Sequence, residues 1–290
     1  MDKLLIHLWY DKEAREAAEL YTSIFPDSKI NKSIILRDTP SGDAELIDFY
    51  LCGKDFQAIS GGPYFRFNPS ISMMVKTPNI EQVNSIWEAL IQGGKELMPL
   101  DKYFFSERYG WLQDKYGLSW QIFHNPDTDK AEISPNLLFS SSVNGKAEEA
   151  ISFYTNSFPN SETIYINRYN ENEASAPEAK INYAEFALDS MKLTAMDNAN
   201  SVDYSFNEAI SFMVRCKNQE EIDYYWNLLS NDREAEQCGW LKDKYGLSWQ
   251  IVPDFLDDAM FDASQELIDK ITKVFLPMKK LDYDKLKNTL

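Results

Sequence analysis

The sequence contains GWLQDKYGLSWQI at residues 110–122 and GWLKDKYGLSWQI at residues 239–251. The two stretches differ only where Gln113 of the first is replaced by Lys242 in the second. A run of this length that returns once along a chain indicates a duplicated segment, and an internal repeat decides how the rest of a sequence is interpreted. Other repeated segments show how far the duplication extends.

Two more pairs of segments recur in the same order. Residues 14–26, which end in YTSIFP, match residues 147–159, which end in YTNSFP, and ISMMV at residues 71–75 matches ISFMV at residues 210–214. Because the order is kept, the repeat is a whole domain rather than a shared motif. The predicted parts are copy 1 at residues 1–127, copy 2 at residues 134–255 and a C-terminal tail at residues 256–290, with a polar join through residues 125–135.

Each copy shows the pattern strand, helix and three strands, twice over. Copy 1 begins with a strand at residues 4–10 and an amphipathic helix that ends at Pro26, because proline disfavours helix in the residue before it. The predicted strands that follow are residues 29–36, 46–52, 56–60, 71–75, 96–100, 104–108 or 109–112, and 118–123, with a helix at residues 83–91. Copy 2 has ten residues fewer between Trp226 and Gly239, so we expect one strand to be missing there. Apolar residues at helical spacing predict a helix at residues 267–275 of the tail and a shorter one after it.

The composition excludes several classes of protein. The formal charge is −17, and no run of Lys or Arg exceeds two residues, so binding to nucleic acid is not expected. No apolar run reaches the length of a membrane span, and the N-terminus has no signal-peptide core. The three cysteines form no CxxC pair, which favours reduced thiols in a cytoplasm over disulfides. The sequence predicts a cytoplasmic protein that interacts with neither membranes nor nucleic acid.

The residues LWYD at 8–11, FPDS at 25–28 and the stretch 110–122 resemble the PhnB-like branch of the vicinal oxygen chelate superfamily. Glyoxalase I, bleomycin-resistance proteins and extradiol dioxygenases belong to this superfamily, and the branch is often labelled 3-demethylubiquinone-9 3-methyltransferase. The resemblance covers residues 4–125 and 137–253. It implies an α+β fold in which paired βαβββ modules form curved mixed sheets, each with a concave cup that holds a small-molecule ligand. Single-copy relatives generally dimerise, so it also implies an internal pseudo-dimer that is a monomer in solution.

The metal ligands of the superfamily's enzymes are only partly matched. The resemblance places the ligand of the last strand at Gln121 in copy 1 and Gln250 in copy 2, where those enzymes usually have Glu, and an amide oxygen binds divalent ions more weakly than a carboxylate. His7 lies in the first strand, but counting from Asp11 places the family's ligand position nearer Leu4, on the opposite side of the strand. Copy 2 has no histidine. We therefore expect no metal and no other cofactor, with His7 a partly buried side chain.

Methyl transfer and nucleophilic catalysis are also poorly supported. A methyltransferase usually needs a glycine-rich turn between a parallel strand and a helix, and neither glycine pair of this sequence stands there. No Ser or Cys has a histidine partner suggested by the sequence. The sequence shows no complete catalytic set, and the question of an enzymatic reaction stays open.

A neutral cup remains as the candidate site. Side chains alternate along a strand, so Ser119 and Gln121 face the cup if Gln121 does, while Trp120 packs behind them under a helix. The same holds for Ser248, Gln250 and Trp249, and His7 is included as a cup residue. The leading hypothesis is a metal-independent small-molecule-binding protein. One alternative is a metal-dependent lyase, isomerase or dioxygenase with His7, Gln121 and an unassigned carboxylate as ligands. The other is a fold kept for assembly alone. The two cups are expected to be unequal, with copy 1 the more complete.

Overall fold

A computed structural model describes residues 2–290 and divides them into two compact units. Unit 1 contains the residues up to Thr22 together with Lys29–Arg66 and Asn207–Leu290, and unit 2 contains Ser23–Ser28 and Phe67–Phe206. Each unit combines the first module of one copy with the second module of the other. The compact units therefore do not coincide with the repeats at residues 1–127 and 134–255.

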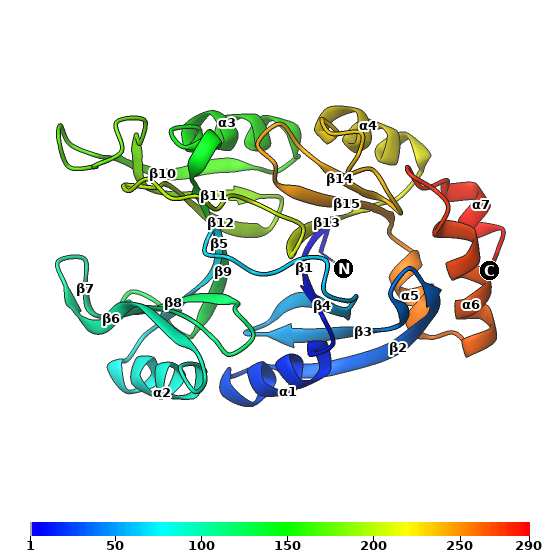
Figure 1. Ribbon diagram of the computed structural model, residues 1–290, viewed down its shortest axis with the longest axis horizontal. Coiled ribbons are helices and arrows are strands. Elements are labelled where there is room, and N and C mark those ends of the chain that lie inside the picture. Colours follow the sequence, from blue (N-terminus) through cyan, green and yellow to red (C-terminus); the bar gives the residue numbers. More distant parts are fainter. Residues whose placement is uncertain (1) are drawn as a thin grey trace. The chain divides into compact units, whose positions relative to one another are not determined.

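Unit 1 is built on a seven-stranded mixed sheet (Figure 1). Its strand order is β14-β15-β13-β1-β4-β3-β2. The strands are β1 (Leu4–Tyr10), β2 (Lys29–Thr39), β3 (Gly42–Leu51), β4 (Lys54–Ser60), β13 (Ile210–Cys216), β14 (Trp240–Lys242) and β15 (Ser248–Pro253). Its helices are α1 (Ala14–Ile24, whose end belongs to unit 2), α4 (Gln219–Leu229), α5 (Leu256–Phe261), α6 (Gln265–Phe275) and α7 (Tyr283–Lys287). The antiparallel pairing of β1 with β13 joins the two copies within this sheet.

Unit 2 is built on an eight-stranded sheet with the order β10-β11-β12-β9-β5-β8-β7-β6. Its strands are β5 (Ile71–Thr77), β6 (Lys95–Tyr103), β7 (Ser106–Gln113), β8 (Ser119–His124), β9 (Glu132–Phe139), β10 (Glu162–Arg168), β11 (Ile181–Leu188) and β12 (Met191–Asp197). Its helices are α2 (Ile80–Leu90), α3 (Ala147–Ser157) and the short 3₁₀ helix η1 (Ser141–Val143). The pairing of β5 with β9 joins the copies here.

The helices α1 to α4 pack on one face of each sheet, which we call the outer face. Helix α1 buries Ala14, Ala17, Ala18 and Tyr21, and the Tyr21 hydroxyl lies 3.2 Å from that of Tyr10 in β1. Because side chains alternate along β1, Leu5, His7 and Trp9 lie on the opposite, inner face. Trp249 is buried on the outer face of unit 1 beside Phe212, with its indole nitrogen donating to Asp243 at 2.9 Å. Trp120 donates to Asp114 in the same way in unit 2, as expected for core packing.

The expected βαβββ modules and the mixed sheets are confirmed, and so is the missing strand of copy 2. Within residues 2–290, no strand separates α4 from β14, whereas α2 is followed by the long strand β6. Strand β7 (Ser106–Gln113) includes all of the alternative at residues 109–112 and residues 106–108 of the other, because residues 104–105 form the turn after β6. The join is shorter than expected, because Ser134 and Pro135 already belong to β9. No helix of the described chain is long and apolar enough to cross a membrane.

The tail takes the place that β6 has in unit 2. The backbone N–H groups of Cys238 and Gly239 donate to the carbonyls of Met278 and Lys279 at 2.7 and 2.8 Å. Gly239 matches Gly110 of the repeat. A Cβ on Gly239 would lie 3.3 Å from the side chain of Leu281, whereas a Cβ on Gly110 would lie 3.1 Å from the backbone of Leu100 in β6. The deletion in copy 2 therefore makes room for the tail.

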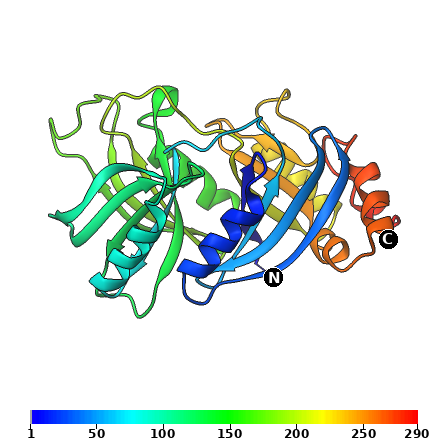
Figure 2. The ribbon, with the colours of Figure 1, turned by 60° about the horizontal axis from the view of Figure 1, so that its bottom comes forward.

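The tail also covers part of the inner face of unit 1. Helices α5 and α6 contact β2 (Figure 2). Ile268 and Ile271 of α6 belong to one buried apolar cluster with Leu5 of β1 and Met213 of β13. Ser264 caps α6 by accepting from the backbone N–H of Leu267, which fixes where the helix begins. This apolar face stabilises the tail on the sheet, because burial of aliphatic side chains contributes about 1.5–3 kcal/mol each.

Candidate functional site

Four polar side chains form a row across the middle of the inner face of unit 1. In the strand register, Gln57 of β4 lies beside His7 of β1, His7 lies beside Ser211 of β13, and Ser211 lies beside Ser248 of β15. Directly paired residues point to the same side of a sheet, so the four side chains share one face. We call these four residues the polar row. The row combines residues from the beginning and the end of the chain.

The polar row contains an unusual number of unpartnered polar atoms. The side chains of His7, Gln57 and Ser248 are 3%, 1% and 1% exposed. Nδ1 of His7, both amide atoms of Gln57 and Oγ of Ser248 are buried without a hydrogen-bond partner. Ser211 differs, because its hydroxyl accepts from Nε2 of Gln250 at 2.9 Å. An unpartnered buried polar atom costs about 1–3 kcal/mol, so native proteins keep few of them and tend to keep them for a purpose.

The polar row is uncharged at neutral pH. Burial lowers the pKa of His7 from 6.5 to about 3, so its imidazole is neutral. Asp48 of β3 lies next to Gln57 in the register, and burial raises the pKa of its carboxyl although Asn31 donates to it at 2.9 Å. The residue that directly adjoins Gln57 in the register is therefore acidic.

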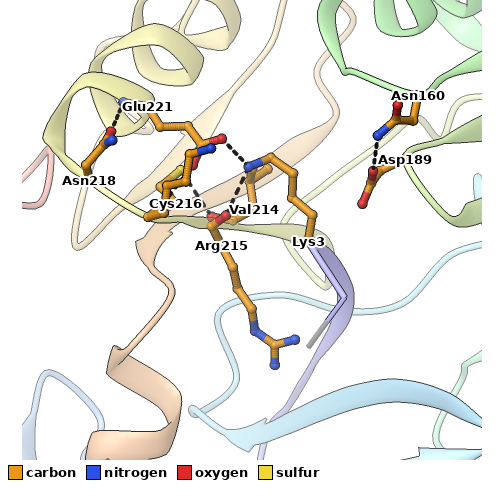
Figure 3. Close-up of polar contacts among 9 residues, drawn as sticks. Lys3, Asn160, Asp189, Val214, Arg215, Cys216, Asn218 and Glu221 are labelled. Atoms are coloured by element: carbon orange, nitrogen blue, oxygen red, sulfur yellow. Dashed lines mark hydrogen bonds and ion pairs between the residues drawn. The ribbon is translucent and has the colours of Figure 1, made fainter.

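A buried ion cluster lies four residues further along β13, at Arg215. The Arg215 guanidinium donates to Asp257 of α5 at 2.9 Å and to Asp55 of β4 at 3.3 Å. Figure 3 shows Arg215 pointing away from Lys3 and Glu221, which pair beside α4. The cluster ties α5 of the tail to two strands of the sheet. Because Asp55 and Asp257 both pair with the Arg215 guanidinium, this group is not free to bind an anion.

Two tryptophans border the polar row. The Trp240 ring meets His7 edge-on at 5.5 Å and Trp9 at 6.0 Å. The Trp9 indole nitrogen donates to the carbonyl of Gly62 at 2.8 Å, and a Cβ on Gly61 would lie 2.3 Å from the Trp9 ring. Glycine is therefore required at position 61 for the indole to lie flat on the backbone. Along the strands, Trp9 lies on one side of the polar row, and the ion cluster of Arg215, Asp55 and Asp257 lies on the other.

Unit 2 carries the corresponding row, but most of its polar side chains have hydrogen-bond partners. The register places Thr194, Asn136, Ser72 and Ser119 side by side. Thr194 donates to Asn136 at 2.9 Å, Trp111 donates to Ser119 at 2.8 Å, and Gln121 donates to Ser72 at 2.8 Å. Of these four side chains, only Asn136 keeps an unpartnered atom, Nδ2. The row of unit 2 thus has one unpartnered atom, whereas the polar row of unit 1 has four.

The predicted site residues are divided between the two sheets. His7, Ser248 and Gln250 lie in unit 1, and Ser119 and Gln121 lie in unit 2. His7 and Ser248 share the polar row, although the sequence count had left the side of His7 open. Gln250 and Gln121 each hold a serine hydroxyl of the neighbouring strand, and Gln121 also accepts from Tyr109 at 2.9 Å. Neither row belongs to a single copy, so the expectation that copy 1 has the more complete cup does not describe this arrangement.

Sequence reasoning missed Gln57, Trp9 and Trp240. Gln57 is the single amide in an otherwise apolar stretch, FQAI at residues 56–59, and this polar interruption was the available signal. Trp240 lies inside the repeated stretch, but its copy-1 counterpart Trp111 hydrogen-bonds to Ser119 instead of meeting a histidine. The role of a repeated residue therefore depends on the sheet that receives it.

The donor set does not match a divalent metal site. The polar row offers one imidazole, an amide and two hydroxyls, whereas hard dications favour carboxylate oxygens. Across residues 2–290, no group of three or more His, Cys, Asp and Glu side chains gathers as a metal site requires. His7 and Gln121, which the metal-dependent alternative combined, belong to different sheets.

Comparisons with known proteins agree with the fold. The family model described as 3-demethylubiquinone-9 3-methyltransferase matches residues 2–123 and again residues 131–252. A Bacillus cereus protein that carries this family label and the name PhnB is 32% identical over 43% of this chain and 100% of its own, with a TM-score of 0.40. Glyoxalase I from Zea mays is 13% identical, covers 88% of this chain and 95% of its own, and has a TM-score of 0.52. No curated protein matches the chain.

The likeness to maize glyoxalase I concerns the fold alone, and the family description names a model rather than a measured activity. The two matches of the family model nevertheless span most of the sequence, and their limits agree with the repeat. The chain therefore belongs to the 3-demethylubiquinone-9 3-methyltransferase family.

Proposed function

We propose that this protein binds a small organic molecule at the polar row of unit 1, without a metal. The observation that carries the proposal is the group of four unpartnered buried atoms on His7, Gln57 and Ser248. A ligand that hydrogen-bonds to them recovers free energy that the unliganded protein lacks. The neutral donor set supports binding without a metal, and the sequence hypothesis of a cytoplasmic location is retained with it.

The geometry supports binding more directly than catalysis. General acid or base chemistry at neutral pH needs a group that titrates near that pH, and the pKa of His7 is lowered to about 3 by burial. Thr194 donates to Asn136 at the corresponding positions of unit 2, where one atom is unpartnered against four in unit 1, so we assign the binding site to unit 1.

A thermal-shift screen of metabolite and antibiotic fragments tests this function. The full chain is screened after treatment with EDTA and again with added Zn, Mn or Ni, and elemental analysis is made on protein purified without chelator. We expect stabilising fragments in EDTA whose effect is lost in Gln57→Leu and reduced in Ser248→Ala. The matched control is Thr194→Val, the counterpart of Gln57 in unit 2, which should leave the fragment effect unchanged.

Three results contradict the proposal. Fragment binding that requires stoichiometric metal favours the metal-dependent alternative. Binding that is lost in Thr194→Val and kept in Gln57→Leu places the site in unit 2. A screen without any stabilising fragment favours a fold that serves assembly alone.

A further inference from the structure

The unpartnered atoms of the polar row define what a ligand must offer. Nε2 of Gln57 needs an acceptor and Oε1 of the same amide needs a donor. The Ser248 hydroxyl can donate or accept, and Nδ1 of neutral His7 takes either role according to its tautomer. A group that satisfies Gln57 therefore has a donor and an acceptor side by side in one plane.

The charges around the row disfavour an anion. The two lysines in register with the row are already paired: Lys242 lies 2.7 Å from Glu208, and Lys32 pairs with Asp262. Arg215 is held by Asp55 and Asp257. A carboxylate or phosphate placed against Gln57 would lie next to Asp48 without a cationic partner, and burial of an unpaired charge is strongly unfavourable.

A simple cation is disfavoured for a different reason. An ammonium group donates hydrogen bonds but accepts none, so it would satisfy Oε1 of Gln57 and leave Nε2 unpartnered. Asp48 could attract such a cation electrostatically, which makes the amine a necessary comparison in any test. Only a neutral group with both functions satisfies the two amide atoms together.

The aromatic border indicates the shape of the ligand. Trp9 and Trp240 meet at an interplanar angle of 80°, and Trp240 meets His7 at 90°. Ring faces and edges in this arrangement favour a flat partner over a bulky aliphatic one, because aromatic pairs prefer offset-stacked or edge-to-face contacts.

We propose that the polar row recognises a neutral, planar molecule with an amide-like edge, such as a primary carboxamide, a lactam or a urea. Gln57 pairs with this edge through two reciprocal hydrogen bonds: Nε2 donates to the ligand carbonyl and Oε1 accepts from the ligand N–H. Ser248 and His7 bind the remaining polar atoms, and Trp9 and Trp240 contact the ring. This inference rests on the proposed function and specifies its ligand class.

Matched probes that differ in one substituent test the ligand class. Nicotinamide, nicotinate and 3-(aminomethyl)pyridine, and likewise benzamide, benzoate and benzylamine, are titrated into the full chain at neutral pH, with 2-pyridone as a lactam. Binding is measured by saturation-transfer NMR and calorimetry. We expect the neutral amides or the lactam to bind about ten-fold or more tightly than the acid and amine of the same ring.

Variants at Gln57 separate this recognition from general stickiness. Gln57→Leu removes both hydrogen bonds and should abolish the preference for amides, whereas Gln57→Glu removes the donors and should shift the preference toward the amines. Ser248→Ala should weaken all neutral probes by a smaller factor, and thermal melts verify that each variant is folded. Thr194→Val in unit 2 serves as the control and should keep the wild-type preference.

Distinct results overturn the two proposals. If fragments bind and respond to Gln57→Leu but the acids or amines bind as tightly as the amides, the ligand class is wrong and the binding site stands. If no amide or lactam binds while other fragments do, the ligand class is also wrong. If no compound of any class binds, the proposed function itself fails.

Discussion

Units 1 and 2 have the same strand order around their centres, but their corresponding rows differ in how many buried polar atoms have a hydrogen-bond partner. Unit 1 has Gln57, His7, Ser211 and Ser248, and unit 2 has Thr194, Asn136, Ser72 and Ser119. In the second set Thr194 donates to Asn136, while Ser119 and Ser72 accept from Trp111 and Gln121, so that one atom is unpartnered, whereas the first set leaves four atoms unpartnered. The difference shows that one duplicated framework can carry a mostly hydrogen-bonded row in one unit and a mostly unpartnered row in the other.

The tail is the second difference between the units. It packs on the inner face of unit 1 through an apolar cluster and the Arg215–Asp257 ion pair. The residue that corresponds to Arg215 in unit 2 is Lys76, which pairs with Glu185 of its own sheet. The repeated framework thus keeps a basic residue at this position and gives it a different partner in each unit.

The largest expected effect comes from the ion cluster. Arg215→Leu leaves Asp55 and Asp257 buried without their cation, which should lower the free energy of unfolding by about 3–5 kcal/mol. Lys76→Leu in unit 2 should lower it by less than about 2 kcal/mol, because Lys76 and Glu185 are more exposed. Urea unfolding monitored by tryptophan fluorescence compares the two variants, and equal losses would contradict the tail-anchoring role of Arg215.

The next effect is the dependence of stability on pH. The pKa of His7 is about 3 in the folded protein and 6.5 in the unfolded chain, so the unfolded chain takes up a proton as the pH falls below 6.5 while the folded protein does not. The contribution of neutral His7 to the free energy of unfolding is present in full above pH 6.5 and is lost as the pH falls toward 3. The free energy of unfolding should therefore fall by about 2 kcal/mol between pH 7.5 and pH 5. His7→Asn, which introduces the residue of unit 2, should show a correspondingly flatter curve in urea melts across this range. Parallel curves for the two proteins would mean that His7 is protonated inside the fold.

Smaller changes in the free energy of unfolding are expected at the corresponding positions Gln57 and Thr194, and the two changes should have opposite signs. In ligand-free protein, Gln57→Leu removes an unpartnered buried amide and should raise the free energy of unfolding by about 1 kcal/mol. Thr194→Val removes a hydrogen bond to Asn136 and should lower it by about 1 kcal/mol. Thermal and chemical melts of both variants decide the sign. A loss of stability in Gln57→Leu would show that its amide already has a partner.

The smallest expected effect concerns assembly. Each sheet already pairs strands from both copies, through β1 with β13 and β5 with β9, so we predict a monomer of 33.6 kDa. Light scattering after size exclusion should give this mass at all concentrations tested. A mass that doubles as concentration rises would contradict the internal pseudo-dimer.

The sequence predicted the secondary structure well because its signals are local. Pro26 marks the end of α1, Gly93 has the positive φ expected after α2, and the deletion in copy 2 located the missing strand. Parity within one strand was also predictable, since Ser119 and Gln121 must lie on the same side of β8 with Trp120 on the other. The counterpart of His7 was not predictable. The offset of the repeated helix matches His7 with Ser140, but the register matches it with Asn136, because η1 lengthens the link between β9 and α3.

The sequence by itself determined the duplication, the modules, the family and two of the tail helices, α6 and α7, but not α5. These follow from residue order, periodicity and turn residues, which act over a few positions of the chain. Only the tertiary structure decided that His7 and Gln57 of copy 1 share a row with Ser211 and Ser248 of copy 2. Backbone hydrogen bonds between strands are nearly blind to side-chain identity, so the choice of strand partner depends on the packing of the whole sheet. The candidate site is therefore a property of that pairing and not of either repeat.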